Sequence, residues 1–303
     1  MLSYFRSALS DTKIDFMKLQ KLALIMSVIC MLASIALVFV KGLNFGIDFA
    51  GGILIEARMQ ETPDLAKIRQ LLEGQAKDLQ IQNIDEKDVL IRVAKSDIEQ
   101  SVLIKKIQTI LNQNYSNIEY RKVDYVGPQV GAELIMRGVM SLLLSFLFIM
   151  IYIWIRFDWQ FGLGGIFALL HDAVLTIGFF AVTQLEFNLT SIASILTIIG
   201  YSINDSVVIY DRIRENLIKF KAISLAQLIN SSINSTLSRT ILTAGATLTS
   251  LLALVIFGGE TLRSFSLSAF FGIIIGTYSS IYISAPILIY LDPRQKKINY
   301  EKK

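Results

Sequence analysis

One aspartate, Asp205, lies in one of the most apolar stretches of the sequence and is the first candidate for chemistry. The run before it, from Leu189 to Ile199, carries no charge. A carboxylate at membrane depth costs roughly 2.5–3.5 kcal/mol on insertion scales, so such residues usually serve a function. A polar residue that only holds helices together can be an asparagine such as the adjacent Asn204. A carboxylate suits that role poorly, because it needs a proton or a counter-charge. We therefore expect Asp205 to handle a proton or to form an ion pair.

Arg239 is the natural counter-ion for this carboxylate. It stands near the start of the next apolar stretch, and on successive antiparallel helices it would lie at a depth comparable to that of Asp205. Arg212, two helical turns after Asp205, is the other basic residue nearby, but Val208 and Ile209 interrupt the polar stripe between them. A guanidinium favours the charged carboxylate and desolvation favours the neutral one, so small movements could exchange a proton. The alternative for Arg239 is a basic anchor that reaches the membrane surface.

His171 and Asp172 form a second polar pair inside an apolar run. Adjacent residues on a helix point about 100° apart, so we expect them to face different neighbours rather than each other. Histidine titrates near neutrality, which permits a role in proton transfer. A hydrogen-bonded structural role is the open alternative.

Small residues recur in two other apolar stretches. Gly162, Gly164 and Gly165 open one of them without a dinucleotide-binding context, which predicts close helix packing. A ladder of small residues at every fourth position predicts a second packing face, within this chain or with another subunit. The ladder consists of Ser268, Gly272, Gly276, Ser280 and Ser284.

Composition places these residues in a membrane. The chain has 303 residues, of which 53% are hydrophobic, and its mean hydropathy is +0.54, too apolar for a soluble domain of this size. The single cysteine, Cys30, excludes an intrachain disulfide, and the single histidine excludes paired-histidine metal motifs. The sequence contains no phosphate loop, zinc motif or nucleophile elbow. We therefore expect no enzyme activity, cofactor, metal or nucleic-acid partner.

Six stretches are long and apolar enough to cross a bilayer, which takes about 20 residues of helix. They are 22–40, 134–155, 161–183, 189–210, 235–257 and 265–291. Lys and Arg concentrate in the tail 1–21, the loop 211–234 and the tail 292–303, which an even number of spans puts on one side. The positive-inside rule then predicts cytoplasmic termini. The first span could be a signal peptide, but a 21-residue leader precedes it and no small-residue cleavage site follows it cleanly, so we expect an uncleaved anchor.

Residues 41–133 form the one long polar segment, which this topology places outside the cytoplasm. Strands are predicted at 53–59, 81–84, 89–93 and 118–126 from short apolar or alternating runs. Thr62 and Pro63 are expected to open one helix, and a capping box of Ser96 and Glu99 to open another that runs through Asn112. The order β-α-β-β-α-β is ferredoxin-like. The predicted fold is an α-helical membrane protein with six transmembrane helices plus an external α+β ferredoxin-like domain.

Four motifs give the sequence a family resemblance. Phe45–Gly52 reads F-G-I-D-F-A-G-G directly after the first span, with Gly46, Asp48, Phe49, Gly51 and Gly52 at the signature positions. This turn is similar to that of the SecD/SecF proteins, membrane components of bacterial protein export. Gly200–Asn216, His171-Asp172 and Ser238-Arg239-Thr240 resemble further motifs of the family. The motif positions depart from the family pattern only by tolerable swaps, such as Ser206 where the family often has Thr.

The resemblance implies a half-sized relative of the RND transporters, in the bacterial cytoplasmic (inner) membrane. The modest size matches the SecF branch, for which SecD would supply the other half. It also implies action with the SecYEG channel and YajC on a translocating preprotein, driven by the proton-motive force. In that family, the residues matching Asp205 and Arg239 are associated with proton conduction.

Two other functions remain open from the sequence. An RND-type proton-coupled exporter of small molecules or lipids would need a deep apolar pocket in the external domain, for which the composition offers little. A passive scaffold of the translocon would not need the charge of Asp205. Contact with membrane lipid is expected in every case.

Overall fold

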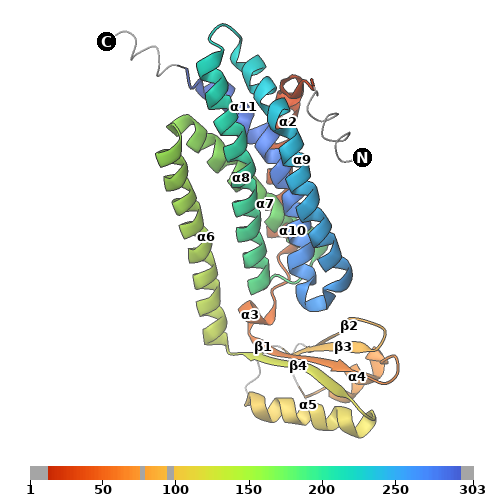
Figure 1. Ribbon diagram of the computed structural model, residues 1–303. Coiled ribbons are helices and arrows are strands. Elements are labelled where there is room, and N and C mark those ends of the chain that lie inside the picture. The colour runs from red at the N-terminus through yellow and green to blue at the C-terminus, as the bar shows by residue number, and fades with distance from the viewer. Residues whose placement is uncertain (1–12, 76–78, 94–98, 295–303) are drawn as a thin grey trace. The chain divides into compact units, whose positions relative to one another are not determined.

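The computed structural model describes residues 13–75, 79–93 and 99–294, and the elements follow one another as labelled in Figure 1. The predicted cap at Ser96 and most of both basic tails lie outside these residues. The chain divides into two compact units. One holds Phe45–Met140 together with Phe187–Leu189, and the other holds the remaining described residues.

The smaller unit contains the predicted ferredoxin-like domain. Its strands are β1 (Gly52–Arg58), β2 (Leu79–Asn83), β3 (Asp88–Val93) and β4 (Glu119–Val126). All neighbours pair antiparallel in the order β2-β3-β1-β4. The helices α4 (Leu65–Leu72) and α5 (Gln100–Asn114) cover one face of this sheet (Figure 1), and their apolar residues pack on alternate residues of β1 and β3. The predicted β-α-β-β-α-β order is confirmed.

The helix starts in this domain differ from the prediction. Asp64, not Thr62, caps α4, because its carboxylate accepts hydrogen bonds from the backbone N–H groups of Ala66 and Lys67 at 2.9 and 3.2 Å. Glu99 precedes α5, and its side chain accepts from the Ser101 hydroxyl but caps no backbone N–H of the helix. One short helix, α3 (Ile47–Ala50), stands before β1 within the signature turn.

The larger unit is built from apolar helices, most of them long. They are α2 (Gln20–Lys41), most of α6 (Pro128–Arg156), α7 (Trp159–Thr183), α8 (Leu189–Lys219), α9 (Leu225–Phe257), α10 (Gly259–Ser279) and α11 (Ala285–Leu291). In the described residues, six helical segments are long and apolar enough to cross a membrane. A short 3-10 helix, η1 (Phe16–Leu19), leads into α2, and a π-helical segment, η2 (Ser280–Ser284), joins α10 to α11. The predicted fold class is therefore confirmed.

The expected cytoplasmic loop 211–234 is mostly helix. α8 runs on to Lys219 and α9 begins at Leu225, so only residues 220–224 connect them. Ser224 caps α9 in a capping box with Gln227, and each side chain accepts from the other residue's backbone N–H. The charged residues of this segment lie at exposed or half-exposed positions of the two helices and their connection, and hydropathy alone does not separate such helix ends from a loop.

Candidate functional site

Asp205 is buried in α8 and points toward α9. Its Oδ1 accepts a hydrogen bond from the Thr240 hydroxyl at 2.6 Å. Its Oδ2 is also buried, and no partner for it exists among the described residues. Only 7% of the residue is exposed. The carboxyl therefore has one oxygen held by a hydroxyl and one oxygen available for a proton.

Arg239 immediately precedes this hydroxyl in the chain but forms no ion pair with Asp205 within the described structure. Its side chain is exposed, and it lies close enough for its charge to act on the carboxyl. The predicted counter-ion is thus a neighbour rather than a bonded partner. The bonded partner, Thr240, follows Arg239 in the quoted Ser238-Arg239-Thr240 motif, which is the signal that could have found it.

Arg212 and Asn204 do not support Asp205 directly. The Arg212 guanidinium donates to the Ser235 hydroxyl at 2.9 Å and pairs with Glu215 at 2.6 Å. Asn204 is exposed on α8. Along the α8–α9 contact, the Asp205 bond and the Arg212–Ser235 bond act together with a bond from the Asn216 amide to the Ser232 hydroxyl at 2.8 Å.

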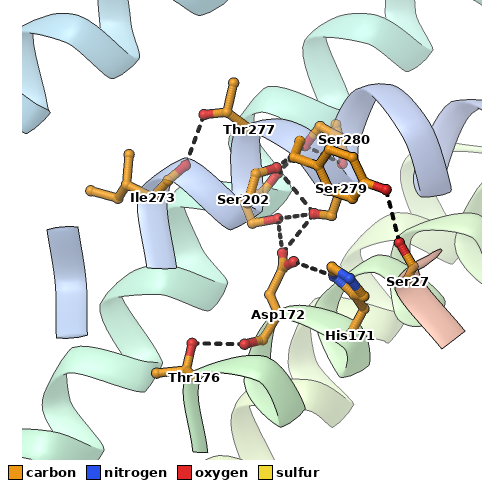
Figure 2. Close-up of polar contacts among 12 residues, drawn as sticks. Ser27, His171, Asp172, Thr176, Ser202, Ile273, Thr277, Ser279 and Ser280 are labelled. Carbon is orange, nitrogen blue, oxygen red and sulfur yellow. Dashed lines mark hydrogen bonds and ion pairs between the residues drawn. The ribbon is translucent and has the colours of Figure 1, made fainter. Parts of the chain in front are cut away.

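Asp172 forms the centre of a second polar cluster, on the side of α8 that faces α7 and α10 (Figure 2). Its Oδ2 accepts from the hydroxyls of Ser202 on α8 and Ser279 on α10 at 2.6 and 2.8 Å. Its Oδ1 lies 3.0 Å from Nδ1 of His171. The prediction that His171 and Asp172 do not face each other is wrong, because side-chain rotation brings the imidazole edge to the carboxylate.

The imidazole of His171 has a second, unbonded nitrogen. Its Nε2 is buried and has no partner in the described structure. The His171 ring lies 6.1 Å from the Tyr278 ring, whose hydroxyl bonds the Ser27 hydroxyl and the Ala23 carbonyl of α2. The cluster therefore connects α2, α7, α8 and α10 through hydroxyl groups and one carboxylate, and it contains no basic residue other than histidine.

The ladder of small residues packs against α8 within this chain. Three serine hydroxyls of the ladder bond α8 at Ser194, Ser206 and Tyr210, at 2.7, 3.0 and 2.6 Å. Between them, a Cβ added at Gly272 would overlap the Ile198 side chain, and one added at Gly276 would lie 3.0 Å from the Ser202 Cβ. The bonded serines each lie 74 positions from their α8 partner, so the two helices run parallel in one fixed register.

The glycines of α7 also mark close contacts. A Cβ at Gly164 would lie 2.7 Å from the Ser284 carbonyl oxygen and 2.8 Å from the Tyr210 hydroxyl. One at Gly162 would lie 2.5 Å from the indole ring of Trp154. These glycines therefore mark close helix packing, as predicted.

The signature turn holds the segment before α8. The Gly46 N–H donates to the Phe187 carbonyl at 2.9 Å, and Asp48 Oδ2 accepts from the Leu189 N–H at 3.0 Å. The Phe49 ring packs on the Phe187 ring, with centroids 5.8 Å apart. Gly51 and Gly52 have φ angles of 73° and 121°, conformations that side chains disfavour. The signature is thus a capping and turning element rather than an exit loop alone.

Comparison with known families assigns the chain. Residues 106–294 match the family described as "Protein export membrane protein SecD/SecF, C-terminal", and residues 36–63 match "SecD/SecF GG Motif". The chain belongs to the SecD/SecF family. The first match contains His171, Asp172, Asp205 and Arg239, and the second contains the signature turn.

Relatives within the SecD/SecF family are similar over most of the chain. Protein translocase subunit SecF of Rickettsia bellii is 55% identical over 278 residues, which is 90% of this chain and 92% of the relative. The SecF subunit of Rickettsia felis is 55% identical over 280 residues and 90% of each chain. These relatives are translocase subunits, and the six apolar helices indicate a multi-pass membrane protein.

Solved SecDF structures show the same fold. The crystal structure of SecDF from Thermus thermophilus, a translocon-associated membrane protein, superposes with a TM-score of 0.85 at 35% identity. It covers 94% of this chain, whereas this chain spans 39% of that protein. SecDF in a super-membrane-facing form superposes with a TM-score of 0.70 over 97% of this chain and 40% of the other.

Proposed function

We propose that this chain is the SecF-type half of a proton-driven accessory unit of bacterial protein export. Its SecF relatives are named as translocase subunits, and SecDF carries a matching region within a chain more than twice as long. A SecD protein is therefore the expected partner half. SecYEG, YajC and the translocating preprotein complete the proposed assembly, which lies in the bacterial inner membrane with both termini in the cytoplasm.

The buried Oδ2 of Asp205 is the observation that carries the proton-driven part of the proposal. A buried carboxylate with an unpartnered oxygen is costly, and a proton removes most of that cost. Thr240 bonds only Oδ1, so Oδ2 remains the site that can take up the proton. Arg239, exposed at the same depth, supplies a charge that can compete with that proton. The device uses no bond-making chemistry, so an enzyme activity is not proposed.

Asp205→Asn tests this role. Asparagine keeps the size of the side chain and can still accept the Thr240 hydrogen bond, but it does not bind a proton at that position. We expect the variant to assemble with its partner half and to lose stimulation of export by the proton-motive force in membrane vesicles. Asp211→Asn on the same helix is the matched control, because the Asp211 carboxylate is exposed and pairs with Arg156. Normal proton-driven export by Asp205→Asn as the sole copy would leave the scaffold function as the better explanation.

A small-molecule exporter is not favoured by the pocket on the external domain. That pocket is lined mainly by charged and polar residues, namely Arg58, Met59, Gln60, Asp85, Glu86, Lys87, Asn117 and Glu119. Apolar ligands prefer sites lined by hydrophobic and aromatic side chains. Vesicles that contain both halves can also report proton flux, and unchanged flux in Arg239→Ala would show that the charge of this arginine is not used.

A further inference from the structure

A pocket of about 440 Å³ lies where α6 ends and α7 begins, apart from the two polar clusters. All its lining residues belong to the helical unit. They are Trp154, Ile155, Arg156, Phe157, Asp158, Trp159 and Arg214. In the proposed topology, this corner lies at the cytoplasmic surface of the membrane. The proposed proton-driven function makes no use of it.

Two guanidinium groups stand over one aromatic ring in this pocket. Those of Arg156 and Arg214 lie 5.1 and 5.4 Å from the centroid of the Phe157 ring. Arg156 pairs with Asp211 at 2.9 Å, and Arg214 donates to the Arg156 backbone carbonyl at 3.0 Å. No acidic side chain forms an ion pair with Arg214 in the described part of the chain. The planar forks of both groups keep further N–H donors for a phosphate.

The lining contains more positive than negative charge. In the lining, two arginines are set against the carboxylate of Asp158, and Asp211 pairs with Arg156 from outside it, so Arg214 is the arginine that no carboxylate pairs with in the described residues. An anion is therefore the ligand that complements the pocket.

Two tryptophans flank these arginines, and they are the only two in the chain. Trp154 and Trp159 are 52% and 49% exposed. Gly162 leaves the space against which the Trp154 indole packs. Tryptophan is enriched at the level of lipid headgroups, because its ring is apolar and its N–H is polar.

The outer face of α6 continues from the pocket as an apolar surface. Ile155 is 82% exposed, and Ile151 and Phe148 are exposed one and two turns back toward the start of the helix. A free phosphate ion would gain nothing from this surface, whereas an acyl chain would bury it. The ligand that fits both the arginines and this surface is amphipathic.

We propose that this pocket binds the headgroup of an anionic phospholipid, with its phosphate at Arg214 and Arg156 and one acyl chain along α6. The two tryptophans then lie at the glycerol level. Binding would fix the corner between the second and third spans at a set depth in the membrane.

Tryptophan fluorescence tests the proposal directly, because both reporters lie in the pocket. The full chain is reconstituted in mixed vesicles in which brominated acyl chains, which quench tryptophan, are carried either by phosphatidylglycerol or by phosphatidylcholine. Each basic residue near an anionic surface favours anionic lipid by about five-fold. We therefore expect quenching to show at least about a five-fold preference for phosphatidylglycerol.

Arg214→Gln should reduce this preference several-fold, and Arg214→Lys should retain part of it. Lys219→Gln is the matched control, since Lys219 lies on the same helix and pairs with Glu215 outside the pocket. A near-native emission maximum and circular dichroism spectrum show that the variants are folded. Equal quenching by both lipids in the wild type, or an equal loss in Lys219→Gln, would overturn the proposal. Displacement of the preference by millimolar inorganic phosphate would overturn it in favour of a free-anion site.

Discussion

Replacing Gly164 by alanine should destabilise the helical unit, although alanine is the better helix former. The added methyl would lie 2.7 Å from the Ser284 carbonyl oxygen and 2.8 Å from the Tyr210 hydroxyl. The first atom belongs to the backbone of η2 and the second is held by the Ser284 hydroxyl at 2.6 Å. Neither neighbour is the free end of a flexible chain, so the helices themselves must separate.

The size of the effect follows from these distances. An ordinary contact begins near 3.4 Å, so α7 and η2 must move apart by roughly 0.7 Å at Gly164. Overpacking of this kind costs about 1–3 kcal/mol, and helix propensity returns up to about 1 kcal/mol. Gly200→Ala is the matched control, because its methyl meets no atom within 4 Å on α8. We expect Gly164→Ala to be less stable than Gly200→Ala by about 2 kcal/mol.

Thermal unfolding of the purified full chain in one detergent measures this difference. About 2 kcal/mol corresponds to a separation of roughly 4–8 °C in Tm for a unit of this size. Gly164→Ala should unfold first, with Gly200→Ala at or above the wild type. If the two variants unfold together, the close approach of α7 to η2 is not what Gly164 provides.

Three further predictions concern the proposed proton site and the ferredoxin-like domain. Thr240→Val removes the hydroxyl that bonds Asp205. The free energy of unfolding should fall by about 1 kcal/mol, and proton-driven export should fall by more than this loss of stability explains. Unchanged export would show that the bond is only structural. Asp88 is buried between Arg58 and Arg121, and its hydrogen bond raises the pKa of Arg58. Asp88→Asn should therefore speed amide hydrogen exchange in β3 by about ten-fold. Unchanged exchange would contradict this. Gly52→Ala places a side chain on a residue with φ near 121°. The resulting backbone strain should lower the free energy of unfolding by about 2 kcal/mol and make the start of β1 sensitive to protease. Full resistance to protease would mean that the turn relaxes without strain.

Local patterns in the sequence were enough to predict the fold class. Long apolar runs specify spans, and short alternating runs specify strands, because each pattern depends only on neighbours in the chain. Errors arose where several local signals compete. Thr62 and Asp64 both suit a helix cap, and only the backbone path shows that Asp64 reaches the N–H groups. The segment 211–234 resembles a loop in the sequence, because the polar residues of amphipathic helix ends lower its mean hydropathy below that of the membrane spans.

The candidate site was predictable in its residue types but not in its bonds. The free-energy cost of a carboxylate in an apolar stretch is enough to single out Asp205, and the positive charge of Arg239 is enough to suggest it as a counter-ion. The actual hydrogen bond comes from Thr240, one residue further along α9, where the helical rotation turns the side chain toward α8. The partner of the small-residue ladder was also open, since spacing defines a face but not what covers it. Contacts between distant segments depend on tertiary packing, which one sequence does not encode in a readable pattern.

The fixed register between α8 and the last span would restrict how the proposed proton at Asp205 is converted into movement. Sliding one helix by a single residue would separate every hydroxyl pair at once, and the next matching position lies four residues, or about 6 Å, away. Small sliding movements along this contact are therefore excluded. We expect α8 to move together with α10, η2 and α11 as one rigid group. The contact of α8 with α9 differs in one respect, because one of its three hydrogen bonds is made by the Asp205 carboxyl itself, so protonation would change that bond directly. Proton-driven strain should thus appear first as a tilt of α9.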